Sequence, residues 1–468
     1  MDKLLMQSIL MKDGKLNTIV EKYKKVSQEY NLITPPTAFH TTPTKQCTNS
    51  EMKNYWQDYT SVNGGEWPCI DFYIGIAYCK GPKRCSYCMY HSKTEPNQQE
   101  LQDYLEKLVI LMENYKEIFK GSFNSLYIGG GTPNIISVEQ MEFLLHKIMK
   151  NFIFKSNSEK TYENSPACYS KDKIKLLHDY GINRLSFGIQ SFDESVLNAV
   201  NRHYTTPKRM CEILEDCRRY GFKNVNVDLM LGLEQQNLAS CTDSFKKLCE
   251  ISPNTITVYV NRHINYNNIQ NKEGFLAEYY KKLIYPALDI IYEIAEQMGY
   301  INLVNDRTLE FQLFMKKDTY LFDNIYRTRF DIEKKNSCFG IGSNSISYIN
   351  SEKYIIEYIT EKNPDRFDLS RPIFNTSIIE KKDMMRLFVI QKLYLEKKVD
   401  FGVFFHNFNR DFLTEFQFEI LCLETLGKAA VTERDMSLLY DSNEEFGMYG
   451  MFFYNQQYVQ QLEQQMEN

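Results

Sequence analysis

The residues best suited to chemistry in this sequence are three cysteines on one short loop. Cys79, Cys85 and Cys88 follow an apolar run, residues 72–78, with the spacing Cys-x5-Cys-x2-Cys. Iron–sulfur clusters are held by cysteine thiolates, usually in compact runs of this kind. Three thiolates would bind three irons of a [4Fe–4S] cluster and leave the fourth iron open to chelate a small molecule. The loop therefore predicts a cluster with one reactive corner.

A structural zinc site is the alternative for the same loop. Such a site needs a fourth Cys or His ligand, and His91 lies three residues after Cys88. A disulfide is disfavoured, because twelve cysteines in a long chain without a secretory signal indicate a reducing compartment. We therefore expect a cytoplasmic protein whose other nine cysteines are small buried hydrophobes.

The composition argues against several classes of partner. The 468 residues suggest two or three domains, and the formal net charge is −5, from 55 basic and 60 acidic residues. A protein that binds nucleic acid or an anionic membrane usually carries a basic surplus, which is absent here. No apolar run approaches the length of a transmembrane helix. We therefore expect neither nucleic acid nor a membrane as partner.

Short apolar runs alternate with amphipathic stretches about six times between residues 71 and 300. This alternation predicts the α/β class, with a parallel sheet and right-handed crossovers in a partial (β/α)6 TIM-like barrel. In such barrels the chemistry belongs at the carboxyl ends of the strands. The polar and glycine positions that fall at or near predicted strand ends, beside Cys79, are residues 129–132, Glu163, Gln190 and Asp228.

Three further segments complete the predicted organisation. Residues 1–70 form an N-terminal extension that could cap the mouth of the barrel, since it leads directly into the cysteine loop. Residues 301–375 are a connecting segment that completes the barrel and its active site. Residues 376–468 are a small, mostly helical C-terminal domain.

Six further motifs follow one another in an order that strengthens the prediction of a cluster. They lie at residues 126–133 (LYIGGGTP), 162–166 (YENSP), 181–192 (GINRLSFGIQSF), 201–203 (NRH), 227–233 (VDLMLGL) and 340–347 (GIGSNSIS). Together with the cysteine loop they resemble radical S-adenosylmethionine (SAM) enzymes, and more specifically the oxygen-independent coproporphyrinogen III oxidase family. The resemblance is strong over about residues 70–350 and weak over 375–450.

The resemblance implies a SAM bound to the open iron of the cluster and cleaved to a 5′-deoxyadenosyl radical. The matching positions are Tyr87, Gly130, Gly131, Thr132, Glu163 and Arg202. In that order, the aromatic ring would lie near the adenine, and the backbone of the next three residues would meet the methionine amino group. Glu163 would accept hydrogen bonds from the SAM amino group or ribose, and Arg202 would face the carboxylate of SAM.

The resemblance also implies positions for a second SAM. These are Tyr73, Gln190, Asp228, Arg262 and Ile346. The candidate catalytic residues are Tyr73, Gln190 and Asp228, although Tyr73 and Ile346 could equally belong to the core. Position 262 is small in the oxidase, so the guanidinium of Arg262 could block the second SAM or bind a carboxylate.

Departures from the family pattern argue against simply assigning the oxidase reaction to this sequence. The first cysteine gap is five residues where the family has three, and residues 232–236 lack the family's Pro-Gly. The leading hypothesis is methyl or methylene transfer from a second SAM to an unactivated carbon, as in methylation or cyclopropanation. The alternatives are oxidative decarboxylation or other radical chemistry on a porphyrin-like or peptide substrate, and a non-catalytic haem chaperone with His203 or His263 as ligand.

The implied partners are a small-molecule or peptide substrate and an electron donor such as flavodoxin or ferredoxin.

Overall fold

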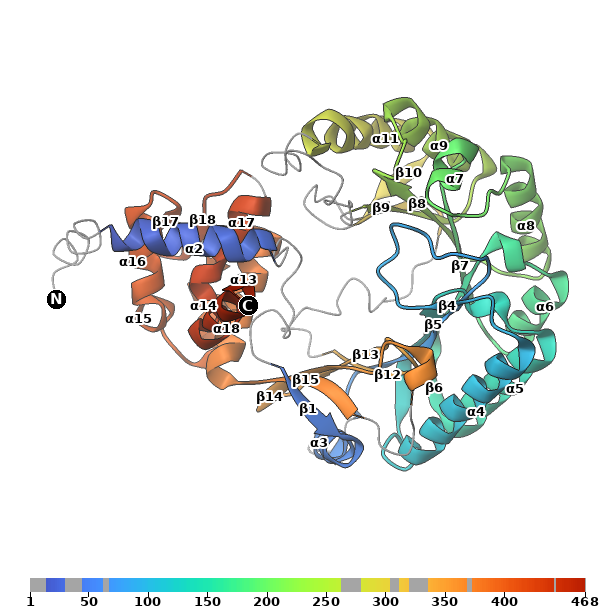
Figure 1. The fold of residues 1–468 in the computed structure, drawn as a ribbon, viewed down its shortest axis with the longest axis horizontal. Coiled ribbons are helices and arrows are strands. Elements are labelled where there is room, and N and C mark those ends of the chain that lie inside the picture. The colour runs from blue at the N-terminus through green and yellow to red at the C-terminus, as the bar shows by residue number, and fades with distance from the viewer. Residues whose placement is uncertain are drawn as a thin grey trace.

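The computed structural model describes residues 14–29, 44–61, 67–261, 279–303, 311–319, 336–367, 373–441 and 443–467. One curved sheet of thirteen strands runs through most of this part of the chain (Figure 1). Its centre consists of six parallel strands: β2 (Ile70–Ile76), β5 (Ser122–Gly130), β6 (Ile153–Asn164), β7 (Arg184–Gln190), β8 (Val225–Leu231) and β9 (Thr255–Val260). The predicted α/β fold with six β/α units is confirmed.

Helices cover the outer face of these strands (Figure 1). They are α4 (Gln98–Tyr115), α5 (Val138–Asn151), α6 (Lys171–Asp179), α8 (Pro207–Arg219), α9 (Leu238–Ile251) and α11 (Tyr285–Gln297). Three of them begin with reciprocal capping boxes, in which the first-turn side chain and the N-cap side chain each satisfy a backbone N–H. The positive φ of Gly181, Gly221 and Gly299 accounts for the chain reversal just after α6, α8 and α11.

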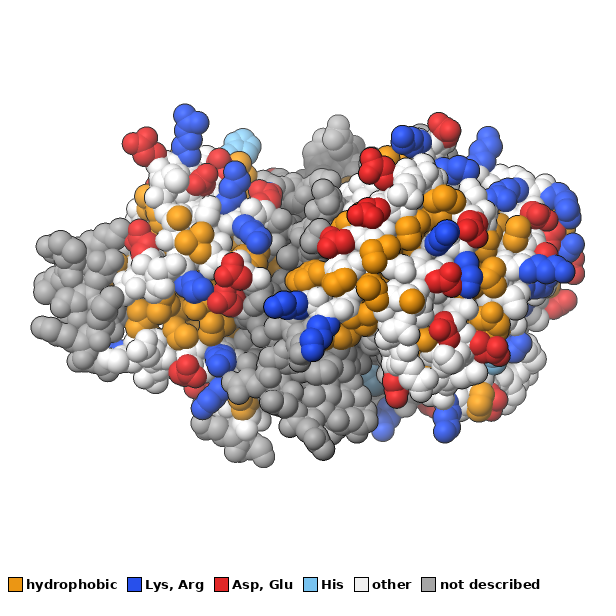
Figure 2. All heavy atoms as spheres, turned by 90° about the horizontal axis from the view of Figure 1, so that it is seen from above, with side chains coloured by type: hydrophobic (Ala, Val, Ile, Leu, Met, Phe, Trp, Pro, Cys, Tyr) orange, Lys and Arg blue, Asp and Glu red, His pale blue; other side chains and the backbone are white. Residues whose placement is uncertain are grey.

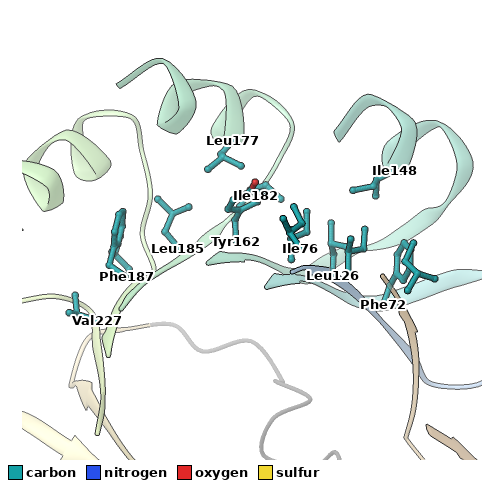
Figure 3. Packing of buried hydrophobic residues seen from close by; sticks show 14 of the residues in the cluster. Phe72, Ile76, Leu126, Ile148, Tyr162, Leu177, Ile182, Leu185, Phe187 and Val227 are labelled. Atoms are coloured by element: carbon teal, nitrogen blue, oxygen red, sulfur yellow. The ribbon is translucent and has the colours of Figure 1, made fainter. Parts of the chain in front are cut away.

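Alternation along the strands separates an apolar outer face from a polar inner face. Apolar side chains of the strands point toward the helices in Figure 3, including Phe72, Leu126, Tyr162, Leu185 and Phe187. Successive strand residues point to opposite faces, so the neighbours of these residues lie on the inner face. The inner face is therefore available to position polar side chains.

Antiparallel strands extend both edges of the sheet. On one side β12 (Ser337–Ile341) pairs in parallel with β2 and leads to β13 (Ile346–Asn350), β14 (Tyr354–Ile359), β15 (Ile373–Glu380) and β1 (Lys45–Thr48). On the other side lie β11 (Phe311–Lys316) and β10 (Tyr300–Asn302). The strand order runs from β1 to β10 without closing, so the barrel is partial.

The described parts of the N-terminal extension pack in two places. Helix α2 (Lys15–Glu29), blue in Figure 1, lies across the C-terminal helices, and Tyr23 donates to Gln456 at 3.0 Å. Helix α3 (Asn49–Ser61) packs at the sheet, where Trp56 Nε1 donates to the Tyr358 hydroxyl at 2.8 Å. Neither helix is placed as a cap on the barrel's mouth, and the boundary at residue 70 remains a prediction.

The C-terminal part has its own apolar core. Its helices are α13 (Lys381–Glu396), α14 (Phe401–Phe408), α15 (Phe412–Glu415), α16 (Gln417–Thr425), α17 (Asn443–Gly450) and α18 (Gln456–Glu467). A small sheet of β16 (Lys398–Asp400), β18 (Asp435–Leu438) and β17 (Ala429–Val431) accompanies them. The part is mostly helical, as predicted.

Charges of both signs are interspersed over the face shown in Figure 2. Among the helices that the structure describes, none combines the length and apolar character needed to cross a bilayer.

Candidate active site

The cysteine loop is held closed at its two ends. Strand β3 (Tyr78–Cys79) pairs with β4 (Lys93–Thr94), so the loop returns to the place where it leaves the sheet. The Lys93 ammonium lies 2.6 Å from Glu100 and 3.0 Å from Asp365. These contacts tie the return of the loop to α4 and to the segment after β14.

The three thiols of the loop are free and lie in different surroundings. The Cys79 sulfur lies 3.2 Å from the Ser92 hydroxyl, and the Cys85 sulfur lies 3.7 Å from the Asn201 carbonyl oxygen. Burial raises the pKa of the Cys88 thiol above its ordinary value. Coordination deprotonates a thiol outright, so iron binding would overcome this raised pKa.

The loop does not form a site for a single metal ion. In the described ranges, no three His, Cys, Asp or Glu side chains are arranged to hold one ion. The three thiols and His91 therefore do not converge as the ligands of a zinc ion would. A [4Fe–4S] cluster takes its thiolates at separate corners and so requires ligands that stand farther apart.

The glycine turn after β5 lies directly against the cysteine loop. Gly131 donates its N–H to the Ile76 carbonyl oxygen at 2.8 Å, and Thr132 donates to that of Tyr78 at 2.7 Å. A Cβ at Gly131 would overlap the Tyr78 carbonyl oxygen, so this approach requires glycine. An ammonium group offers only donors, so the turn could meet one through its carbonyl oxygens or the Thr132 hydroxyl.

Glu163 lies at the end of β6, next to this turn. Tyr127 donates its hydroxyl to one carboxylate oxygen at 2.6 Å, and the Gly130 N–H donates to the other at 3.2 Å. Burial raises the pKa of Glu163 to about 7, an effect opposed by the Tyr127 hydrogen bond and reinforced by the charge of Asp228. A cation bound here would favour the ionised carboxylate.

Gln190 ends β7 in an irregular conformation. Its φ is 71°, and the pairing of β7 with β8 shifts register between Gly188 and Gln190. The side-chain oxygen of Gln190 is buried without a hydrogen-bond partner in the described structure. A Cβ on Gly188 would lie 2.9 Å from Gln190 Nε2 and 3.0 Å from Arg202 Nη2. Because Gly188 has no side chain, the ends of the Gln190 and Arg202 side chains can both lie against its α-carbon.

Arg202 connects this strand end with the cysteines. Its guanidinium donates to the Gly188 carbonyl oxygen. Burial disfavours the charge, but the neighbouring Tyr87 and Cys85 hold the pKa of Arg202 above its usual range. Tyr87 is itself buried, and its hydroxyl lies beside the Cys85 thiol.

Asp228 lies on the inner face of β8. The Ser186 hydroxyl donates to one of its oxygens at 2.9 Å, and Asn226 Nδ2 donates to the other at 2.6 Å. Burial raises the pKa of Asp228 above its ordinary value. The carboxylate is therefore held in place from two sides.

A small hollow joins Tyr73 to the glycine turn. The hollow is narrow and is lined by Tyr73, Ala77, Tyr90, His91, Gly130, Gly131, Ser343 and Asn344. The Tyr73 ring stacks on Tyr127 with ring centroids 5.9 Å apart. Tyr90, His91 and Asn344 were not predicted to face a ligand. The glycine signal at residues 339–344 marked this turn, but nothing in it singled out Asn344.

Other predicted residues lie apart from the hollow or outside the description. Ile346 begins β13, is half-buried and pairs with Ile359. His203 lies beside the cysteine loop, with its ring 3.1 Å from the place of a Cβ on Gly81. Arg262 and His263 lie outside the described residues.

The residues present fit a cluster and a bound nucleotide. Three free thiols on one loop supply the donors, and the turn at Gly131 leaves no side chain between the loop and the sheet. One buried polar atom, the Gln190 side-chain oxygen, has no hydrogen-bond partner in the described part of the chain. A ligand seated here could satisfy this atom. The individual roles of the predicted residues remain predictions.

Comparison with known proteins decides the nature of the site. Residues 78–248 match the model of the radical SAM superfamily. The chain contains a radical SAM domain. The domain spans the cysteine loop, the glycine turn and the ends of β6, β7 and β8, and its cofactors are SAM and a [4Fe–4S] cluster.

Sequence relatives of the radical SAM domain include oxidases and haem chaperones. The chain is 33% identical over 206 residues to an oxygen-independent coproporphyrinogen III oxidase of Synechocystis sp., covering 43% of each chain. It is 32% identical over 197 residues to the heme chaperone HemW of Haemophilus influenzae, covering 41% of this chain and 51% of the relative. These matches span about half the length of the relatives.

A longer but weaker match extends beyond the radical SAM domain. An oxygen-independent coproporphyrinogen III oxidase of Helicobacter pylori is 24% identical over 377 residues, with 77% of this chain and 80% of the relative covered. The structure of coproporphyrinogen III oxidase from Escherichia coli superposes with a TM-score of 0.67 at 19% identity, covering 86% and 93% of the two chains. This structural likeness establishes the shared fold.

Proposed function

We propose that the protein is a radical SAM enzyme that transfers a methyl or methylene group from a second SAM to an unactivated carbon. The observation that carries the proposal is the pair of polar groups at the ends of β7 and β8. Gln190 presents a buried oxygen that has no partner among the described residues, and Asp228 presents a carboxylate held by the Ser186 and Asn226 donors. Neither residue belongs to the set expected to contact the first SAM.

When bound and reduced, the cluster and SAM supply a 5′-deoxyadenosyl radical that can abstract hydrogen from a substrate. The protein's part is to bind and orient. Glu163 would accept from the SAM amino group, carbonyl oxygens of the glycine turn would meet the same group, and Arg202 would hold the carboxylate. Burial around Tyr87 would exclude water from the reacting centre.

Two carboxylates on the described part of the inner face would suit a ligand that carries positive charge. Glu163 and Asp228 lie near each other there, and the Arg184 guanidinium, 4.0 Å from Glu159, offsets part of their charge. SAM carries a sulfonium and an ammonium group, so it suits an acidic surface. A porphyrinogen with several carboxylates would need a surplus of cations at the same place.

Oxidative decarboxylation is the second candidate function. It is supported by the names of the relatives, above all the match that covers 77% of this chain. A haem chaperone is the third candidate, with His203 beside the cysteine loop as a possible ligand.

The products of SAM distinguish these functions. The reconstituted protein would be reduced anaerobically and given SAM with a small-molecule cell extract, and 5′-deoxyadenosine and S-adenosylhomocysteine would be quantified. We expect both products, and we expect Asp228→Ala to lose S-adenosylhomocysteine while keeping 5′-deoxyadenosine. The matched control is Asp172→Ala on the exposed surface of α6.

Two outcomes would contradict methyl transfer. One is 5′-deoxyadenosine alone, together with loss of carboxyl groups from added coproporphyrinogen III, which would favour the oxidase. The other is neither product, together with tight stoichiometric haem binding, which would favour the chaperone.

A further inference from the structure

Asn226 is a buried amide on the inner face of β8, one strand repeat before Asp228. Its side chain is fully hydrogen-bonded. The Oδ1 atom accepts from the Thr255 and Thr257 hydroxyls at 2.9 and 3.0 Å. The Nδ2 atom donates to Asp228 at 2.6 Å and to the Ser186 hydroxyl at 2.9 Å. Two acceptances and two donations use the whole capacity of a carboxamide.

This pattern fixes the orientation of the amide. An ionised carboxylate accepts hydrogen bonds only, so Nδ2 must face Asp228. The two threonine hydroxyls then donate to the opposite side of the amide, which holds Oδ1 toward β9. The register of the strands places Asn226 opposite both Thr255 and Ser186, so the parallel pairing itself assembles the network.

Ser186 completes a closed ring with the same two residues. Its hydroxyl accepts from Asn226 Nδ2 and donates to the second oxygen of Asp228 at 2.9 Å. Each carboxylate oxygen of Asp228 therefore receives one hydrogen bond from this pair. Rotation of the carboxylate about its bond to the β-carbon would break both bonds.

We infer that Asn226, together with Ser186, is a positioning residue for the second SAM site. Each carboxylate oxygen has about two acceptor positions. Asn226 and Ser186 take one from each oxygen, and the Thr257 hydroxyl also lies within reach of the carboxylate. Acceptor capacity is still left for a ligand hydroxyl, such as those of the SAM ribose. This inference rests on the proposed function, because it assigns Asn226 a role only if a second SAM binds at Asp228.

The test is the number and affinity of SAM molecules bound by the reconstituted, unreduced protein, measured by equilibrium dialysis with radiolabelled SAM. We expect two SAM per chain for the wild type. A hydrogen bond to a charged group is worth enough for Asn226→Leu or Ser186→Ala to weaken the second SAM about tenfold or more. The first SAM should bind with unchanged affinity, which also reports that the variants fold.

A charge variant separates positioning from mere packing. Asn226→Asp replaces the donor facing Asp228 with a second carboxylate. Two such groups cannot both ionise cheaply at this distance, so the second SAM should be lost at neutral pH and partly regained as the pH falls. Thr376→Val, which removes a fully buried hydroxyl from β15, should leave both affinities unchanged.

The outcomes distinguish a failure of the proposed function from a failure of the role assigned to Asn226 and Ser186. A wild type that binds a single SAM would overturn the proposed function and the inference with it. A wild type that binds two, with Asn226→Leu and Ser186→Ala both binding two at wild-type affinity, would overturn the inference alone.

Discussion

Glu163 carries a charge that depends on pH near neutrality. Its pKa is raised to about 7, so the group is ionised above that pH and protonated below it. Protonation removes the negative charge and turns one carboxylate oxygen into an O–H donor, which weakens its attraction for an ammonium group. We expect the affinity for SAM to fall as the pH drops through about 7, as measured by SAM titration across this range.

Two variants test the cause of this pH dependence. Glu163→Gln removes the titrating group, so its weaker SAM binding should no longer vary over the same pH range. Tyr127→Phe removes the hydrogen bond that favours the ionised carboxylate, so the midpoint should move upward. A midpoint that moves downward in Tyr127→Phe would contradict the assignment.

Each cysteine of the loop should be required for the cluster. Cys85→Ser removes one of three thiolates, so iron content and the visible absorption of the reconstituted protein should be lost. Cys211→Ser, which changes a half-buried thiol on α8, is the matched control and should retain both. Full iron content in Cys85→Ser would refute the cysteine loop as the cluster site.

Some residues of the candidate site could be predicted from sequence patterns, and others could not. Cys79, Glu163 and Gln190 could be predicted because local motifs mark the ends of their strands. Asn226 could not, since its role depends on hydroxyls from two neighbouring strands. The same holds for Asn344, which reaches the glycine turn only through the pairing of β12 with β2.

At the level of elements, two glycines allow close approach at the ends of the strands: Gly188 beside two side chains, and Gly131 beside the backbone of the cysteine loop. A Cβ at Gly188 would crowd only the ends of the Gln190 and Arg202 side chains, which can move. A Cβ at Gly131 would instead meet the backbone of Tyr78. Gly188→Ala should therefore keep its melting temperature and cluster but bind SAM about tenfold more weakly, a loss typical of one charged hydrogen bond.

Gly131→Ala should impair cluster assembly itself and not only SAM binding, because the cysteine loop must shift to make room for the added methyl group. We expect this variant to lose most of its iron content on reconstitution. Equal effects of the two substitutions on iron content would contradict this distinction between side-chain and backbone contacts.

The parallel strands could be predicted from alternation alone, but some boundaries could not. The pattern of residues 160–163 taken alone predicts a short strand there, whereas β6 begins at Ile153. Its first two residues, Ile153 and Phe154, pair with the start of β5, and the polar stretch that follows spans an irregular register. Such pairing is a tertiary effect that local propensity does not record.

At the scale of the whole molecule, the N-terminal helix α2 is part of the C-terminal core. Leu16, Tyr23 and Val26 are buried there, and the Tyr23 ring meets Phe452 edge-on at 5.0 Å. Local patterns could not indicate this contact, because Tyr23 and Gln456 lie 433 positions apart. The extension therefore could not be assigned a role from its own pattern.

Tyr23→Ala should destabilise the C-terminal part by about 3 kcal/mol, as loss of a large buried aromatic side chain commonly does. Thermal unfolding and limited proteolysis of the C-terminal helices would measure the effect. Lys25→Ala, at an exposed position of the same helix, is the control and should change little. An unchanged unfolding profile in Tyr23→Ala would show that α2 is not needed for this core.

The most direct test of the radical SAM assignment is the formation of 5′-deoxyadenosine by the anaerobically reconstituted and reduced protein. We predict that the wild type converts SAM to 5′-deoxyadenosine and that Cys85→Ser, treated identically, does not. A wild type that holds its full cluster and still leaves SAM intact, with or without a substrate extract, would contradict a catalytic role for this site.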